Sequence, residues 1–202
     1  MRRIGALIFP GFELLDLFGP MEMFGLLPED FELALVAEGM NAIESSQGPK
    51  AQPDTTIDDV DDFDILFVPG GAGARHEVNN EALLEWIRAA SARAEYTLSV
   101  CTGSALLAKA GVLDGRSATT NKAAFHWVAD QGPEVRWIRE ARWVEDGAFI
   151  TSSGVSAGMD MALGAIALMQ GQDIAEKVAM WAEYTWHREK DHDPFAKVHG
   201  LV

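Results

Sequence analysis

The chain has 202 residues, of which 48% are hydrophobic and 23% are charged, a balance typical of globular proteins. Its 31 acidic and 16 basic side chains give a net charge of −15, which would repel nucleic-acid phosphates and anionic membrane surfaces. We therefore expect one domain over residues 1–202, with no nucleic-acid partner and no membrane partner.

The start of the chain predicts a strand rather than a targeting segment. No apolar run approaches the roughly 20 residues that a membrane-spanning helix needs, and the opening run stops at Pro10. The single cysteine cannot form an internal disulfide. A reducing, cytoplasmic location is therefore expected.

Short apolar runs alternate with amphipathic stretches along the first two thirds of the chain. The apolar runs predict strands covered on both faces, at Ile4–Phe9, Leu33–Ala37, Ile65–Val68 and Tyr96–Val100. The amphipathic stretches predict helices at Leu14–Leu26, Glu81–Ala94, Gly103–Ala110 and Ala123–Asp130. Pro20 marks either the true first turn of its helix or a kink. The alternation favours an α/β sandwich with a mostly parallel sheet and helices on both faces.

The last third of the chain opens with a hairpin pattern. Asp146-Gly147 lies between two short apolar runs within Trp143–Thr151, which predicts a β-ribbon. Two closing helices are predicted at Ala157–Met169 and Asp173–Tyr184, with Gly171 between them.

Cys101 stands where the buried run ending at Val100 turns into a helical pattern that begins with Thr-Gly-Ser. This strand–turn–helix layout is that of a nucleophile elbow, in which the side chain at the turn is forced out above the sheet. The free N–H groups of a helix N-terminus favour an anion, so the pattern predicts a lowered thiol pKa, with the Thr102 N–H beside the sulfur. The alternative is a small buried hydrophobe, and this stretch alone leaves both interpretations open.

Two further stretches point to the same edge of the sheet. Pro69-Gly70-Gly71 follows a buried strand, so the Gly71 N–H can join that of Thr102 in an oxyanion-type pocket; a plain glycine turn is the alternative. Asp16 lies among leucine and phenylalanine side chains, where a carboxylate needs a partner or a proton. A surface position on the polar face of its helix is the alternative for Asp16.

The histidines do not form a convincing site. His126 lies between Phe125 and Trp127 and is expected to pack rather than to act as a base. His187 and His192 lie in a charged tail whose spacing matches no closed metal site. We expect neither a metal nor a cofactor.

An ordered set of motifs resembles the PfpI-like superfamily, also called the ThiJ or Parkinsonism-deglycase superfamily, over nearly the whole chain. The motifs are Phe-Pro-Gly-Phe…Leu-Asp…Gly-Pro, Val-Pro-Gly-Gly, Ser-Val-Cys-Thr-Gly-Ser, Ala-Gly-Val-Leu-Asp-Gly-Arg-Ser-Ala-Thr-Thr and Thr-Ser-Ser-Gly-Val-Ser-Ala-Gly-Met-Asp. Asp16 and the Cys-Thr-Gly of the elbow look most like isocyanide hydratases and the amidase-like domains of certain transcriptional regulators.

The resemblance implies a flavodoxin-like fold, a homodimer and a small electrophilic substrate. It implies that Cys101 is the nucleophile, Asp16 its acidic partner, and Gly71 and Thr102 the backbone donors. Thr102 stands where the protease branches place histidine, which disfavours a Cys-His peptidase. The hydratases' Thr-Thr-His-Trp is replaced by Thr119-Thr120-Asn121-Lys122, which bears on the substrate.

The implied activity is that of a lyase that hydrates small isocyanides to N-substituted formamides through a Cys101 thioimidate. Such a substrate needs a narrow apolar pocket, for which the candidate wall residues are Leu17, Phe18, Gly71 and Val155. A glyoxalase or deglycase acting on 2-oxoaldehydes and a non-enzymatic sensor of oxidative stress are the alternatives.

Overall fold

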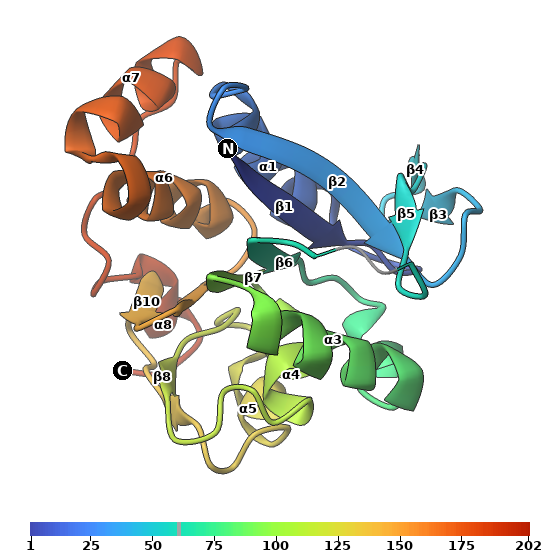
Figure 1. The fold of residues 1–202 in the computed structure, drawn as a ribbon. Coiled ribbons are helices and arrows are strands. Elements are labelled where there is room, and N and C mark those ends of the chain that lie inside the picture. The colour runs from blue at the N-terminus through green and yellow to red at the C-terminus, as the bar shows by residue number, and fades with distance from the viewer. Residues whose placement is uncertain (60–61) are drawn as a thin grey trace.

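The computed structural model describes residues 1–59 and 62–202, and a seven-stranded sheet lies at the centre of this part of the chain (Figure 1). In spatial order the strands are β10 (Trp143–Asp146), β11 (Phe149–Ser152), β7 (Tyr96–Val100), β6 (Ile65–Val68), β1 (Arg2–Leu7), β2 (Phe31–Ala37) and β5 (Thr55–Thr56). All neighbours are parallel except β10 and β11. The predicted mostly parallel sheet is confirmed.

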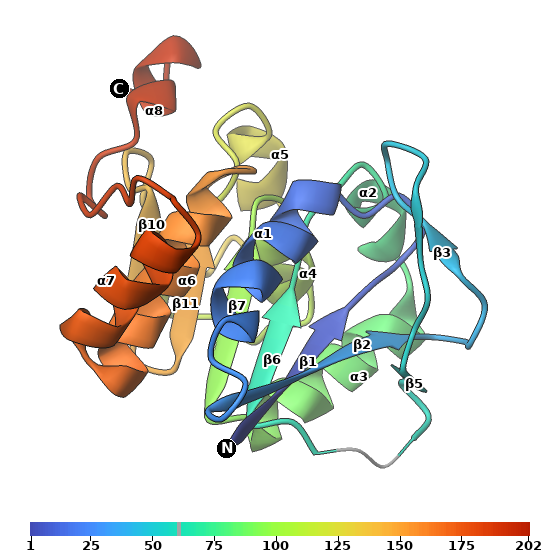
Figure 2. The ribbon, with the colours of Figure 1, turned by 90° about the horizontal axis from the view of Figure 1, so that it is seen from above.

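Helices cover both faces of the sheet (Figure 1). On one face lie α1 (Leu14–Gly25) and α6 (Ala157–Gln170), which pack against each other, and α7 (Gln172–Trp181) packs on α6 (Figure 2). On the other face lie α3 (Glu81–Arg93) and α4 (Gly103–Lys109). This arrangement confirms the α/β, flavodoxin-like sandwich.

The central strands are apolar because both of their faces are covered. Every residue of β6 is buried, as are the last four of β1 and of β7. The Asp146-Gly147 turn joins β10 to β11 as an antiparallel pair, as predicted, and β11 then continues the parallel sheet beside β7. Pro20 lies inside α1, which already begins at Leu14, so it does not mark the first turn.

Several short elements complete the described chain. They are β3 (Ile43–Glu44), β4 (Lys50–Ala51), α2 (Ala74–Glu77), β8 (Ser117–Ala118), α5 (Phe125–Ala129), β9 (Arg136–Trp137) and α8 (Pro194–Val198). Only α5 was among the predicted elements. The others are too short for a hydrophobic period to reveal them.

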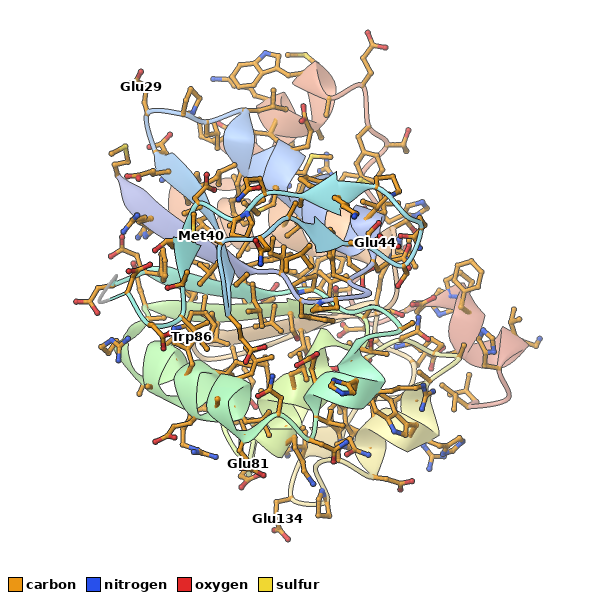
Figure 3. All side chains as sticks on the ribbon, turned by 90° about the vertical axis from the view of Figure 1, so that its right-hand side faces the viewer. Glu29, Met40, Glu44, Glu81, Trp86 and Glu134 are labelled. Atoms are coloured by element: carbon orange, nitrogen blue, oxygen red, sulfur yellow. The ribbon has the colours of Figure 1, made fainter. Side chains whose placement is uncertain are left out.

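The outer surface carries much of the negative charge. Glu29, Glu81 and Glu134 come from separate segments and project outward (Figure 3). Within residues 1–59 and 62–202, the helices are too short or too polar for any of them to cross a membrane.

Candidate active site

Cys101 lies at the turn between β7 and α4. Its φ angle is 56°, in the left-handed region that side chains rarely adopt, and it is 7% exposed. Its N–H donates to the carbonyl oxygens of Ser152 (3.2 Å) and Ser153 (3.1 Å), while its own carbonyl accepts from the hydroxyls of Ser104 (3.0 Å) and Thr120 (2.8 Å). The strained turn is thus held from both sides, and the predicted strand–turn–helix elbow is confirmed.

Asp16 comes from the first turn of α1 and is completely buried. Its Oδ2 accepts the N–H of Gly70 at 3.0 Å. Oδ1 has no partner at ordinary hydrogen-bond geometry in the described part of the chain, but the Cys101 thiol and the Val155 N–H approach the carboxyl group and favour its charged form. Asp16 is therefore not a surface residue, and it lies beside Cys101.

Val155, at the entry to α6, is a second strained residue of this site. Its φ angle is 50°, which is rare for a residue whose side chain branches at Cβ. The loop that holds it in this conformation directs its N–H toward Asp16. Such strain persists only where the surrounding structure enforces it, so the loop's conformation is part of how the carboxyl group is bound.

Burial governs the protonation of the Asp16 carboxyl group. It raises the pKa of Asp16 to about 7, and the neighbouring Glu13 carboxylate adds to the rise. The donors around Asp16 act in the opposite direction without cancelling this effect. An acid with this pKa can both give and accept a proton near neutral pH.

The Cys101 thiol also has a raised pKa, first because it is buried and then because the Asp16 charge lies beside it. The Thr102 N–H and the Asn121 side chain lower it, but by less. The prediction of a lowered thiol pKa is therefore wrong, because the helix N-terminus is outweighed by a dry site and a neighbouring acid. The two acids form one coupled pair that shares a proton.

The Pro69-Gly70-Gly71 turn lies against Thr102. The Gly71 N–H donates to Thr102 Oγ1 at 3.0 Å, and that hydroxyl donates to the Gly71 carbonyl at 3.2 Å. Gly71 is therefore not the free oxyanion donor that the sequence predicted, since its N–H is already bound. Gly70 reaches the site instead, and a Cβ there would lie 2.5 Å from Thr102 N and 2.8 Å from Asp16 Oδ2.

The segment Thr119–Lys122 passes beside the elbow and contributes a residue that the sequence did not assign to the site. The Asn121 side chain lies near enough to Cys101 to lower the pKa of its thiol. Lys122 is buried and points elsewhere, its Nζ donating to Thr119 Oγ1 at 2.8 Å and to the Ala141 carbonyl. Burial lowers the pKa of Lys122 to about 8. The one sequence clue to Asn121 was that it departs from the hydratase motif.

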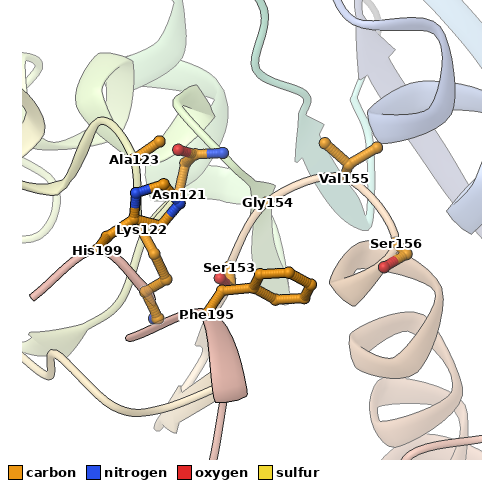
Figure 4. A pocket seen from close by; sticks show the side chains of 9 residues that line it. All are labelled: Asn121, Lys122, Ala123, Ser153, Gly154, Val155, Ser156, Phe195 and His199. Atoms are coloured by element: carbon orange, nitrogen blue, oxygen red, sulfur yellow. The ribbon is translucent and has the colours of Figure 1, made fainter. Parts of the chain in front are cut away.

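A cavity of about 200 Å³ opens beside this segment (Figure 4). Its walls are formed by Asn121, Lys122, Ala123, Ser153, Gly154, Val155, Ser156, Phe195 and His199. Of these, Val155 influences the pKa of Asp16 and Asn121 that of Cys101, so the cavity lies near the buried acid and thiol.

The predicted pocket wall is only partly correct. Val155 lines the cavity, whereas Gly71 does not. Leu17 is fully buried in the core, and Phe18 is 45% exposed on the outer side of α1. The sequence could not anticipate that α8 and the residue after it supply Phe195 and His199, because this short helix follows a long irregular tail.

The other histidines lie apart from the thiol. His126 is exposed on α5, and its ring meets that of Phe125 edge to face. The His187 N–H donates to Asp160, and His192 Nδ1 lies 3.0 Å from Glu140 Oε1. Across residues 1–59 and 62–202, no three histidine, cysteine or acidic side chains gather as metal ligands would.

A mostly parallel sheet whose central strand ends in a cysteine elbow, with a buried carboxyl group beside it, defines an α/β protein of the nucleophile-elbow type. The DJ-1/PfpI family model matches residues 2–168, and the chain belongs to that family. The resemblance drawn from the sequence motifs is confirmed.

Several relatives are similar over most of the chain. It is 39% identical over 184 residues to the isonitrile hydratase of Pseudomonas putida, a match that covers 90% of this chain and 78% of that protein. The deglycase PfpI of Pyrococcus furiosus is 29% identical over 143 residues, covering 70% and 83%. The crystal structure of a THiJ/PfpI family protein from Pseudomonas syringae is 34% identical with a TM-score of 0.84, covering 96% and 76%.

Proposed function

We propose that the protein is a cysteine-dependent hydratase that adds water to small isocyanides and releases N-substituted formamides. The observation that carries this proposal is the buried Asp16 carboxyl group, with a pKa of about 7, beside the Cys101 thiol. The similarity to an isonitrile hydratase supports the same chemistry.

The reaction uses the thiol and the carboxyl group in turn. With the proton of the pair on Asp16, the Cys101 thiolate forms a bond to the terminal isocyanide carbon, and that carbon takes the proton from Asp16, which gives a thioimidate. Asp16, now ionised, removes a proton from water as the oxygen adds to the same carbon. Asp16 passes that proton to the nitrogen, and the C–S bond breaks to release the Cys101 thiolate. The hydroxyl proton returns to the Asp16 carboxylate as the formamide leaves. One water molecule is consumed, and nothing is oxidised or reduced.

The cavity beside Val155 and Asn121 is the proposed site for the substrate's substituent. Its volume of about 200 Å³ fits a small group, and Phe195 and Val155 supply apolar wall. Lys122 lines it as well, but its amino group is engaged by acceptors within the protein. A small uncharged substituent therefore suits this cavity.

A second candidate is a deglycase acting on 2-oxoaldehydes. The specific observation in its favour is the 29% identity to the deglycase PfpI, together with a thiol and an acid that suit either electrophile. Oxidation sensing by Cys101 is the non-enzymatic alternative. In each case the reactive atom is the same sulfur.

The test is formation of the formamide from an aryl isocyanide, followed by ultraviolet absorbance. Wild type is expected to turn over, Cys101→Ala to be inactive, and Asp16→Asn to lose roughly 10²–10⁴-fold, as for a general acid–base group. Glu22→Gln, which changes an exposed acid on the same helix, is the matched control and should keep wild-type activity.

The outcomes separate the candidates. Consumption of methylglyoxal that depends on Cys101, without isocyanide turnover, would replace the hydratase with the deglycase. Rapid peroxide modification of Cys101, with neither substrate consumed, would replace both with the sensor.

A further inference from the structure

We propose that Asn121 is a catalytic residue whose side-chain amide donates a hydrogen bond to the Cys101 sulfur and stabilises the attacking thiolate. The inference deepens the proposed function and rests on it for the identity of the substrate. The donor's role at the sulfur can be measured without any substrate.

The first observation is the orientation of the amide. Asn121 Oδ1 accepts the N–H of Ala124 at 3.0 Å, at the start of α5. Because this contact occupies the oxygen end, the Nδ2 end points toward Gly154, which follows Ser153, the residue whose carbonyl accepts the Cys101 N–H. A neutral N–H donor there can stabilise a thiolate without becoming an acid that competes for its proton.

The second observation is the space that the neighbouring loop leaves for Nδ2. A Cβ added at Gly154 would lie 2.3 Å from Asn121 Nδ2 and 3.2 Å from its Cγ. The φ angle of Gly154 does not lie in the positive region, so backbone strain does not require glycine there. The requirement is room for the amide, which Figure 4 shows directed toward Gly154.

The third observation is the charge around the sulfur. Burial and the Asp16 carboxylate both oppose formation of the thiolate, and the donors that offset them are the Thr102 N–H and the Asn121 side chain. Lys122, the next residue, extends away from the amide toward Thr119 and Ala141 (Figure 4). It therefore does not take the place of Asn121 as a donor.

Two pairs of variants test the proposal. Asn121→Ala removes the amide, and Gly154→Ala keeps it but pushes it from its place. Asn121→Ser retains an oxygen that can accept the Ala124 N–H, yet it is too short to reach the sulfur. Asn79→Ala, at an exposed asparagine outside the site, is the control.

The first readout is the pH dependence of Cys101 alkylation by iodoacetamide, and the second is isocyanide turnover. Asn121→Ala, Asn121→Ser and Gly154→Ala should each reduce the thiolate fraction at a given pH about tenfold, as expected for a hydrogen bond to a charged group. Turnover should fall by at least the same factor. Gly154→Ala should have little further effect in the Asn121→Ala background, because the clashing amide is then absent.

The outcomes are distinct. Unchanged alkylation profiles in folded Asn121→Ser and Asn121→Ala would overturn the proposal, as would full additivity of the Gly154 and Asn121 changes. If the profiles shift and the double variant is non-additive while wild type does not hydrate isocyanides, the hydratase function fails and the role of Asn121 at the sulfur stands.

Discussion

At the scale of single residues, Asp16 is the clearest case of a side chain whose burial opposes stability. It is completely buried, and one of its oxygens lacks a well-placed partner in the described part of the chain. A buried carboxylate without full hydrogen bonding destabilises a fold. The cost of burying Asp16 depends on pH, because the protonated carboxyl group avoids most of the desolvation penalty of the charged form.

Asp16→Asn should stabilise the protein at neutral pH and change little in acid. Burial raises the pKa of Asp16 from 3.8 to about 7 in the folded state. Below about pH 4 the group is neutral in folded and unfolded chains alike. Between about pH 4 and pH 7, Asp16 is ionised in the unfolded chain but still largely protonated in the folded chain. The free energy of unfolding of wild type therefore falls as the pH rises.

Above pH 7 the penalty is complete and amounts to several kcal/mol, since each tenfold change in acid dissociation is worth about 1.4 kcal/mol. The measurement is the melting temperature of wild type and Asp16→Asn from pH 4 to pH 8. The melting temperature of Asp16→Asn should exceed that of wild type by a margin that grows with pH up to about 7. Parallel curves would show that Asp16 carries no such penalty.

At the scale of elements, the start of α4 is held unusually close to the end of β6. A Cβ at Gly103 would lie 2.2 Å from the Val68 carbonyl oxygen and 2.7 Å from that of Pro69. These are backbone atoms of a central strand and its turn, so they cannot move aside cheaply. The absence of a side chain at Gly103 therefore sets how close the elbow lies to the Pro-Gly-Gly turn.

Gly103→Ala should destabilise the fold by about 1–3 kcal/mol, as overpacking does, and should also lower the reactivity of Cys101. Urea unfolding and iodoacetamide alkylation measure the two effects. Gly39→Ala is the matched control, because a Cβ there meets nothing within 4 Å, and it should stay within about 0.5 kcal/mol of wild type. A folded Gly103→Ala with wild-type reactivity would show that the close approach is incidental.

At the scale of the whole molecule, a buried ion pair joins the end of the sheet to α6 and to the C-terminal tail. Arg142 Nε donates to Asp160 Oδ2 at 2.7 Å, and both side chains are almost fully buried. Asp160 Oδ1 also accepts from the Tyr184 hydroxyl at 3.0 Å and the His187 N–H at 2.9 Å. Because α8 follows this tail and lines the cavity, the ion pair also supports the proposed substrate site.

Arg142→Met should cost about 3–5 kcal/mol, because it leaves the Asp160 charge buried without its cationic partner. Urea unfolding at low and high salt is the measurement, and the loss should change little with salt. The exposed Arg93–Asp62 pair, 2.9 Å apart, is the control, and Arg93→Met should cost less than about 1 kcal/mol. An equally small loss of unfolding free energy in both variants would mean that the buried ion pair does not stabilise the packing of the C-terminal tail.

The sequence by itself determined the layered α/β fold, because fully apolar strands and amphipathic helices have periods that are visible along the chain. It also singled out Asp16 and Cys101, whose local patterns left two interpretations open and whose roles were implied by the family resemblance. The homodimer and the cytoplasmic location stay predictions from sequence.

Only the tertiary structure decided which groups surround the thiol and what its pKa is. Asn121 is distant from Cys101 in the chain and Val155 is distant from Asp16, and the fold brings each pair together. Val155 follows β11, which ends beside β7. The sequence predicted a lowered thiol pKa from the helix N-terminus alone. Desolvation and the charge of Asp16 outweigh that local effect, and both depend on what the folded chain packs around the sulfur.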